Sequence, residues 1–181
     1  MRENGKQYLQ HLDNIFETEP RFFEFSDKGE FPPFYSLTYR DKPDQGMVTG
    51  ITLGVSFVEP RNGGNVRPEL MVSVDSEDDL WVLALADIGY QHRGKIGFRP
   101  GDTINFNAKI SDESAMTSFL VWNQGVIPED LELVCLPDWH IEIVQLFPIH
   151  DNERRSINEH GPEWLFERVA DPQDVTRPSV A

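Results

Sequence analysis

Residues 47–58, MVTGITLGVSFV, alternate between two sets of side chains along their whole length. Because successive side chains of a β-strand point to opposite faces of a sheet, this period of two predicts a strand. Gly50 and Gly54 fall on one face, where glycine is typical of a bend or of a second element packed close to the backbone. The other, more apolar face carries Met47, Thr49, Ile51, Leu53, Val55 and Phe57. A chain with such a strand in its first half must be built around a β-sheet.

The remaining segments surround this strand with both kinds of secondary structure. Further strands are expected at residues 21–25, 33–39, 67–74, 103–110, 115–122, 131–136 and 139–149. Helices are expected at residues 4–16, 77–91, 151–160 and 162–170. The segment 67–74 should pair antiparallel with the central strand. No repeat or long linker divides the chain, so we predict a single α+β domain over residues 1–181, with a central mixed, largely antiparallel sheet flanked by helices.

The charge balance restricts the possible partners. The chain has 16 Lys and Arg against 31 Asp and Glu, a formal net charge of −15. Phosphate backbones and anionic membrane surfaces would repel such a protein, so neither a nucleic acid nor a membrane is an expected partner. A basic protein would be attracted to it. An equally good explanation is that the acidity only keeps the protein in solution.

Cys135 is the only cysteine, so an intramolecular disulfide is impossible, as is usual in a reducing cytosol. Its neighbours Val134 and Leu136 predict a buried, inert thiol. The first residues lack the apolar core of a signal peptide, and no run approaches the roughly 20 apolar residues of a membrane span. A soluble, cytoplasmic protein is therefore expected.

An acidic cluster, Asp75, Glu77, Asp78 and Asp79, precedes the helix predicted at 77–91. As a helix start the cluster is already explained, because Ser76 is a suitable N-cap and acids in a first turn favour the positive end of the helix dipole. The same four acids also form a candidate partner-binding patch. Both interpretations stay open.

The histidines His140, His150 and His160 follow one another at intervals of ten residues, with Glu142, Asp151 and Glu153 nearby. All of these are possible metal ligands. However, His140 and His150 lie at opposite ends of a predicted strand, which places them on the order of 30 Å apart. The alternative is structural: Pro148 ends the strand, His150 caps a short helix, and Glu153 occupies the acidic position of a capping box. We therefore predict no metal site, and a metal-dependent hydrolase using His140 and His150 remains the rival hypothesis.

Other chemistry has even less support. The sequence has no phosphate-binding G-x-x-x-x-G-K-[ST] loop and no G-x-S-x-G nucleophile turn. No catalytic residue and no cofactor are therefore expected.

With the elements in order, the chain resembles the Suppressor of fused family, particularly its bacterial members. The similar stretches are TLGVS at 52–56, PEL at 68–70, GD at 101–102, IEIVQLFPIHDNE at 141–153 followed by Gly161, and TRPSV at 176–180. Their order and approximate spacing match the family from about residue 30 to 181. The chain departs from the family where Glu153 is followed by Arg154, since other members usually have Glu-Leu there.

The resemblance implies a protein-binding domain without catalytic activity. In this family the animal member sequesters a transcription factor by gripping a short extended peptide, and bacterial members are often thought to neutralise toxins as immunity proteins. We therefore expect an immunity-type protein that binds another protein, such as a basic toxin domain. A regulatory scaffold that captures an extended peptide of an endogenous protein is the alternative.

Overall fold

The alternating segment forms one of the central strands of a mixed sheet. In a computed structural model of the chain, which describes residues 3–25, 31–60 and 63–181, this strand is β3 (Val48–Leu53). The sheet has eight strands, with β1-β2-β3-β4-β8-β6-β5 side by side and β7 paired to β8. The other strands are β1 (Arg21–Phe25), β2 (Phe34–Arg40), β4 (Val66–Val74), β5 (Thr103–Asn105), β6 (Ser118–Asn123), β7 (Leu133–Cys135) and β8 (His140–Ile149).

One pairing, between β4 and β8, is parallel, and it joins two halves of the sheet that are far apart in sequence. The strands β1 to β4 form an antiparallel meander, and β5, β6 and β7 join through antiparallel pairs to one another or to β8. The predicted α+β domain with a mixed, largely antiparallel sheet is therefore confirmed. Positions 1–2, 26–30 and 61–62 of the predicted domain lie outside the described residues.

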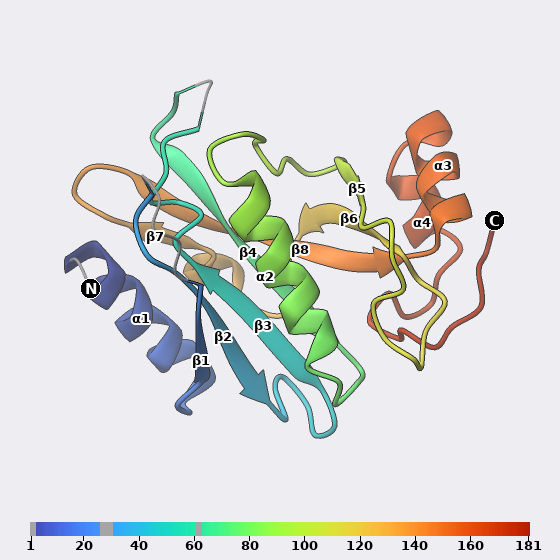
Figure 1. Cartoon of the computed structure of the whole chain (residues 1–181), viewed down its shortest axis with the longest axis horizontal. Helices are drawn as coiled ribbons and strands as arrows, with labels where there is room; N and C mark the ends of the chain where they lie inside the picture. Colours follow the sequence, from blue (N-terminus) through green and yellow to red (C-terminus); the bar gives the residue numbers. More distant parts are fainter. Residues whose placement is uncertain (1–2, 26–30, 61–62) are drawn as a thin grey trace.

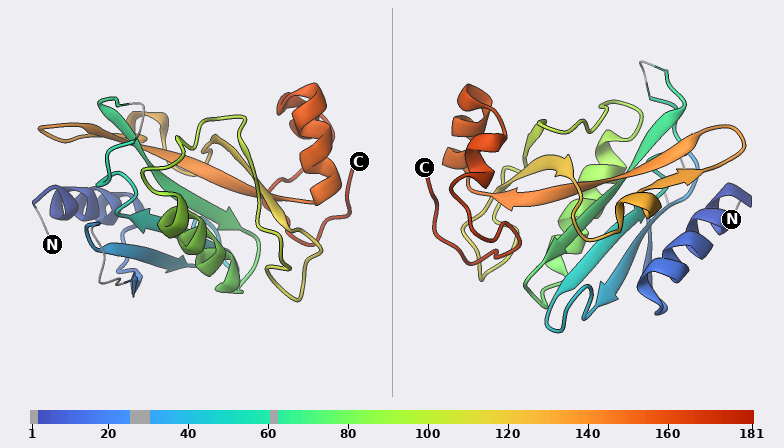
Figure 2. Two further views of the ribbon diagram at one scale, coloured as in Figure 1. Left: turned by 45° about the horizontal axis from the view of Figure 1, so that its top comes forward. Right: turned by 180° about the vertical axis from the view of Figure 1, so that it is seen from behind.

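Helices cover both faces of the sheet. Helix α2 (Leu80–His92) lies across one face, and α1 (Glu3–Phe16) packs against the opposite face (Figures 1 and 2). On the α1 side, Tyr8, Leu12 and Phe16 form one cluster with buried residues of β2, β3 and β8. On the α2 side, Trp81, Val82 and Leu85 pack with β4 and β6. Because both faces are covered, all six residues of β3 are buried.

The glycine face of β3 lies directly beneath α2. A Cβ atom added to Gly50 would lie 2.7 Å from Cγ1 of Val82. The helix therefore approaches the strand as closely as the absence of a side chain allows, which confirms the packing predicted for this glycine.

A third cluster lies at the C-terminal end of β8. It is formed by α3 (Asp151–His160), α4 (Glu163–Phe166) and the strands they cover, through Ile157 and Leu165 packed on Leu120, Phe147 and Ile149. A 3-10 turn, η1 (Glu129–Leu131), precedes β7. Within the described ranges, no helix is long and apolar enough to cross a membrane.

Several local predictions were wrong, and the strand expected at 103–110 and the helix expected at 162–170 are shorter, at Thr103–Asn105 and Glu163–Phe166. The central strand ends at Leu53 rather than Phe57, because the chain turns at Gly54, whose φ is 132°. Helix α2 begins at Leu80, later than the acidic segment suggested. Cys135 is exposed, because Val134 and Leu136 take the inward positions of the edge strand and leave the residue between them facing out.

Candidate functional site

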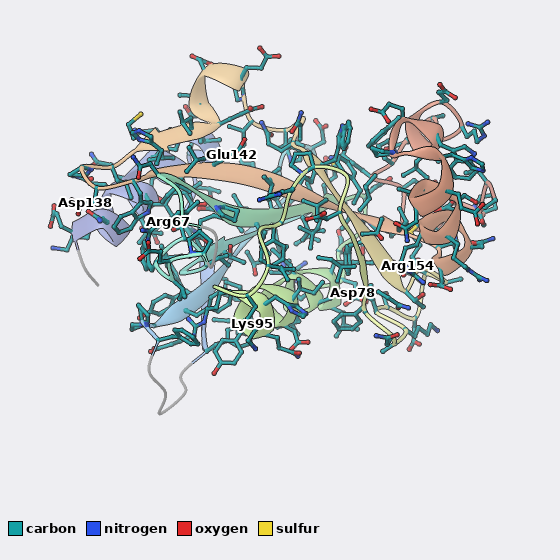
Figure 3. The ribbon with its side chains drawn as sticks, turned by 90° about the horizontal axis from the view of Figure 1, so that it is seen from above. Arg67, Asp78, Lys95, Asp138, Glu142 and Arg154 are labelled. Carbon is teal, nitrogen blue, oxygen red and sulfur yellow. The ribbon has the colours of Figure 1, made fainter. Side chains whose placement is uncertain are left out.

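The acidic segment Asp75–Asp79 connects the end of β4 to the start of α2. Asp75 and Glu77 are exposed, whereas Asp78 and Asp79 are half-buried. Figure 3 shows Asp78 at the N-terminal end of the helix, on the α2 side of the molecule. The predicted site residues are thus contiguous in space, but they have different surroundings.

Asp79 is held by arginines from two strands. Its carboxylate accepts hydrogen bonds from Arg21 at the start of β1 and from Nη2 of Arg40 at the end of β2, the latter at 2.6 Å. Nη1 of Arg40 also donates to the backbone carbonyl of Glu77, at 2.9 Å. These contacts tie the edge of the sheet to the start of α2. Asp79 is therefore engaged within the chain and offers a partner less free charge than its sequence position suggests.

Asp78 and Ser76 are held from the other side, by the loop before β6. Ser111 donates from Oγ to Oδ2 of Asp78 at 2.6 Å, and the backbone N–H of Leu80 donates to Oδ1. The Ser76 hydroxyl donates to Glu113, whose Oε1 also accepts from the indole N–H of Trp81 at 3.2 Å. Ser76 is therefore not the N-cap of α2: Asp79 holds that position, and the Ser76 hydroxyl accepts from the backbone N–H of Asp78, at 3.0 Å, outside the helix.

The exposed acidic residues of this surface are Asp75, Glu77 and Glu113, and Oε1 of Glu113 is also hydrogen-bonded to Ser76 and Trp81. We call these three residues the acidic patch. The patch includes Glu113, which sequence analysis missed because 34 or more positions separate it from the segment it joins. Arg21 and Arg40 were missed for the same reason. Their positions at the ends of adjacent predicted strands were the available signal.

The histidines are not brought together. His140 and His150 lie at the two ends of β8, as the strand prediction required. Nε2 of His150 is 3.1 Å from the backbone oxygen of Arg177, so this ring is part of the packing of the C-terminal segment. Over the ranges described, no group of three or more His, Cys, Asp or Glu is arranged to hold a metal ion.

Two of the stretches that resemble the family, TLGVS at 52–56 and PEL at 68–70, meet around a buried carboxylate. Glu69 of β4 is fully buried, and it accepts hydrogen bonds from the backbone N–H groups of Gly54, Val55 and Ser56 and from the hydroxyls of Thr52 and Ser56. Burial raises the pKa of Glu69, and the hydrogen bonds from Thr52, Ser56 and Gly54 oppose that rise. The TLGVS turn is thus shaped around the carboxylate of the PEL strand.

A second buried carboxylate, that of Glu153, joins the family-like stretches at 141–153 and 176–180. Glu153 of α3 accepts from Nη1 and Nη2 of Arg177, at 2.6 and 2.9 Å, and from the backbone N–H groups of His150 and Val180. Burial alone would raise the pKa of Glu153, but these hydrogen bonds and the charge of Arg177 outweigh it and hold the pKa below its ordinary value. The hydrogen bond to His150 is the predicted acidic half of the capping box.

Most of the chain matches the model of one known protein family. The model of the Suppressor of fused protein (SUFU) family matches residues 32–179, which include β2 to β8, both buried carboxylates and α4. The chain belongs to the Suppressor of fused family. The resemblance inferred from the ordered stretches is therefore confirmed.

Solved structures of the family share the fold. A SUFU homologue from Neisseria gonorrhoeae FA 1090 superposes with a TM-score of 0.73 at 19% identity, covering 98% of this chain and 96% of that one. A chain of the Sufu–Fu complex gives a TM-score of 0.71 at 16% identity, with 97% and 91% covered.

Drosophila Suppressor of Fused gives a TM-score of 0.69 at 17% identity, and the match covers 97% of this SUFU-family chain but 50% of the Drosophila protein. Among curated proteins, no match to the sequence is found. These superpositions show that the chains share one fold.

Proposed function

We propose that this chain is a cytoplasmic, non-enzymatic protein of the immunity type, which binds a basic toxin domain and blocks it. The observation that carries the proposal is that the chain has both a SUFU fold and a net charge of −15. One structural relative belongs to a protein–protein complex, the Sufu–Fu complex. Binding would cover the toxin surface and neutralise its positive charge.

The acidic patch of Asp75, Glu77 and Glu113 is the surface proposed to meet such a partner. Asp78 and Asp79, the other two acids expected in the patch, support it from below through their contacts with Ser111, Arg21 and Arg40. A rigid acidic surface loses little side-chain freedom on binding, and its charge increases the association rate with a basic protein at low salt.

Two experiments test the proposal. The first is co-purification of the chain with adjacently encoded proteins, at low and at high salt. The second is growth rescue of cells that produce those proteins. The variant Asp75→Asn/Glu77→Gln should lower the association rate about tenfold or less at low salt and have a smaller effect at high salt. The matched variant Glu159→Gln/Glu163→Gln removes two exposed acids from α3 and α4 and should bind normally.

The outcomes separate the two parts of the proposal. If no adjacently encoded protein is bound or neutralised, the immunity role is wrong. If both double variants weaken binding equally, the partner responds to net charge and the acidic patch is not its site.

A second candidate function is a regulatory scaffold that captures an extended peptide of an endogenous protein. The sheet supports this alternative because it is open, with β1 as one outer strand and an exposed Phe22 on it. An outer strand can pair with an added strand. Binding of an endogenous protein, with no protection against any neighbouring gene product, would favour this function.

A further inference from the structure

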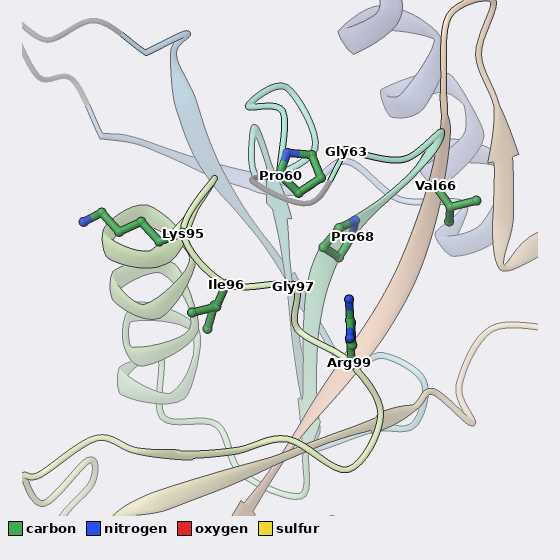
Figure 4. A pocket seen from close by; sticks show the side chains of 8 residues that line it. All are labelled: Pro60, Gly63, Val66, Pro68, Lys95, Ile96, Gly97 and Arg99. Atoms are coloured by element: carbon green, nitrogen blue, oxygen red, sulfur yellow. The ribbon is translucent and has the colours of Figure 1, made fainter.

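A small pocket lined by Lys95 and Arg99, among other residues, lies near the opposite end of α2 from the acidic patch. It is formed where the β3–β4 connection, the start of β4 and the segment after α2 meet (Figure 4). Its volume is about 180 Å³. The residues around it are Pro60, Gly63, Val66, Pro68, Lys95, Ile96, Gly97 and Arg99. We call it the Arg99 pocket.

Exposed aliphatic side chains form part of the wall of the Arg99 pocket. Val66 is 47% exposed and Ile96 is 38% exposed, which are high values for aliphatic side chains. Pro60 and Pro68 complete the apolar lining. A pocket this small has room for one or two side chains and is below the usual range of cofactor sites, about 300–1,000 Å³.

Arg99 supplies the charge. In Figure 4 the side chain of Arg99 extends toward Pro68, whereas that of Lys95 points away from the pocket. Nζ of Lys95 donates to the backbone carbonyl of Gln91 at 2.7 Å. Arg99 is exposed, and no hydrogen bond or salt bridge of its guanidinium with another described residue is found. The guanidinium of Arg99 is therefore available to an anionic group beside the exposed Val66 and Ile96 side chains.

The segment that carries Arg99 is held in place before any ligand binds. Phe98 is 1% exposed and packs in the α2-side cluster. The backbone N–H of Arg99 donates to Oδ2 of Asp102 at 2.9 Å, and that of Gly101 donates to the carbonyl of Val121 at 2.8 Å. Arg99 therefore projects from a fixed backbone, which lowers the entropic cost of binding.

We propose that the Arg99 pocket binds a single carboxylate flanked by an aliphatic side chain in a partner protein. A guanidinium matches a carboxylate with two parallel hydrogen bonds, and Val66 and Ile96 would cover the aliphatic group. The net charge of −15 repels polyanions, which favours one carboxylate over a nucleic acid or a strongly acidic segment. The inference rests on the proposed protein-binding function and adds a second, chemically opposite contact to the acidic patch.

Glu142 provides an internal check on this assignment. It is exposed and pairs with Pro68 across the β4–β8 ladder. Glu142 is two positions from Val144, which packs on the α2 side, so it faces the same side of the sheet as the pocket. Its negative charge opposes a carboxylate ligand. Removing that charge should therefore strengthen binding.

The test is a two-dimensional NMR titration of the full chain with acetyl-Val-Glu-Val-amide, compared with acetyl-Val-Gln-Val-amide. The amide signals of Val66, Ile96 and Gly97 should shift and saturate with the Glu peptide, and the Gln peptide should bind about tenfold more weakly. Acetyl-Val-Val with a free C-terminal carboxylate distinguishes a chain end from a side chain as the source of the carboxylate.

Variants assign the effect to the pocket. Arg99→Gln should weaken binding of the Glu peptide about tenfold, and Glu142→Gln should strengthen it about twofold. Arg155→Gln, the same change at an exposed arginine of α3, should leave it unaltered. If Arg99→Gln fails to fold, Val66→Thr should weaken binding by removing part of the apolar wall.

Equal binding of the Glu and Gln peptides, or unchanged binding by Arg99→Gln, would overturn the inference. Tighter binding of a phosphoserine peptide than of the Glu peptide would also overturn it, because the pocket would then be a phosphate site. No toxin is used in this titration. A chain that binds the Glu peptide but protects against no neighbouring protein therefore refutes the immunity role alone, and the reverse result refutes the Arg99 pocket alone.

Discussion

Arg177 and Glu153 form a buried ion pair, with 2.6 Å between Nη1 and Oε1. The side chain of Glu153 is inaccessible and that of Arg177 is 8% exposed. The pair fastens the segment after α4 to the first turn of α3, and Glu153 also accepts from the backbone N–H of Val180 at 3.0 Å. The attachment of the C-terminal segment to α3 therefore depends on the Glu153 carboxylate.

Replacing Arg177 with Ala should destabilise the protein strongly, because it leaves the Glu153 carboxylate buried without its cation. The expected loss in the free energy of unfolding is about 3–5 kcal/mol. Urea denaturation measures this loss, and limited proteolysis should show faster cleavage between residues 170 and 181. The exposed pair of Arg155 with Asp151 is the control, since Arg155→Ala should cost less than about 1 kcal/mol. Equal losses in the two variants would contradict a special role for Arg177.

The same pair should make stability sensitive to acid. The pKa of Glu153 is lowered from an ordinary value of 4.5, so the folded state binds its proton less tightly than the unfolded state does. Its contribution is fully present above that value and is lost as the pH falls through the lowered pKa of the folded state. Denaturation midpoints measured from pH 6 downward should fall more steeply for the natural chain than for Glu153→Gln. Parallel curves would refute this assignment.

Replacing Glu69 with Gln should disturb the turn between Gly54 and Ser56. The backbone N–H groups of Gly54, Val55 and Ser56 can only donate, and the amide NH₂ of Gln would face some of them in place of an acceptor. Lost hydrogen bonds to a charged group predict destabilisation by about 3 kcal/mol. Glu142→Gln, an exposed change on the neighbouring strand β8, is the control in the same denaturation series and should be nearly neutral. A neutral Glu69→Gln would mean that the turn holds its shape without the carboxylate.

Replacing Gly50 with Ala should push α2 away from β3. The added Cβ would lie 2.7 and 2.9 Å from the two Cγ atoms of Val82, so either the helix or that side chain must move. Overpacking of this kind costs about 1–3 kcal/mol. In thermal denaturation, Val82→Ala in the Gly50→Ala background should recover part of the loss. Gly125→Ala, where nothing lies within 4 Å, is the control. Additive effects of the two substitutions would contradict direct contact.

Patterns among neighbouring residues correctly predicted the strand β3 and the start of helix α3. Alternation identified β3 and placed Gly50 on the face that a second element approaches closely. The i to i+3 spacing of His150 and Glu153 predicted a contact at the start of α3. These features depend on residues within a few positions of one another, so the sequence contains their signal directly.

The errors arose where distant residues decide local structure. The central strand stops at Leu53 because the following turn binds Glu69, which sits on the next strand. Helix α2 starts late because the Ser76 and Asp78 side chains contact Glu113 and Ser111, more than 30 positions away. In the candidate site, the four acids were found because they lie within five consecutive positions. The arginine partners of Asp79 required knowledge of which strand ends meet.

The parallel contact between β4 and β8 has a consequence for the order in which the protein is made. During translation, β1 to β4 can assemble as a meander as they leave the ribosome, but the residues of β4 from Val66 to Met71 lack their β8 neighbour until His140–Ile149 has been synthesised. For that interval the nascent chain has an unprotected strand edge of the kind that promotes aggregation. Pausing or truncation before residue 140 should therefore be more harmful to the cell than a similar interruption after residue 149.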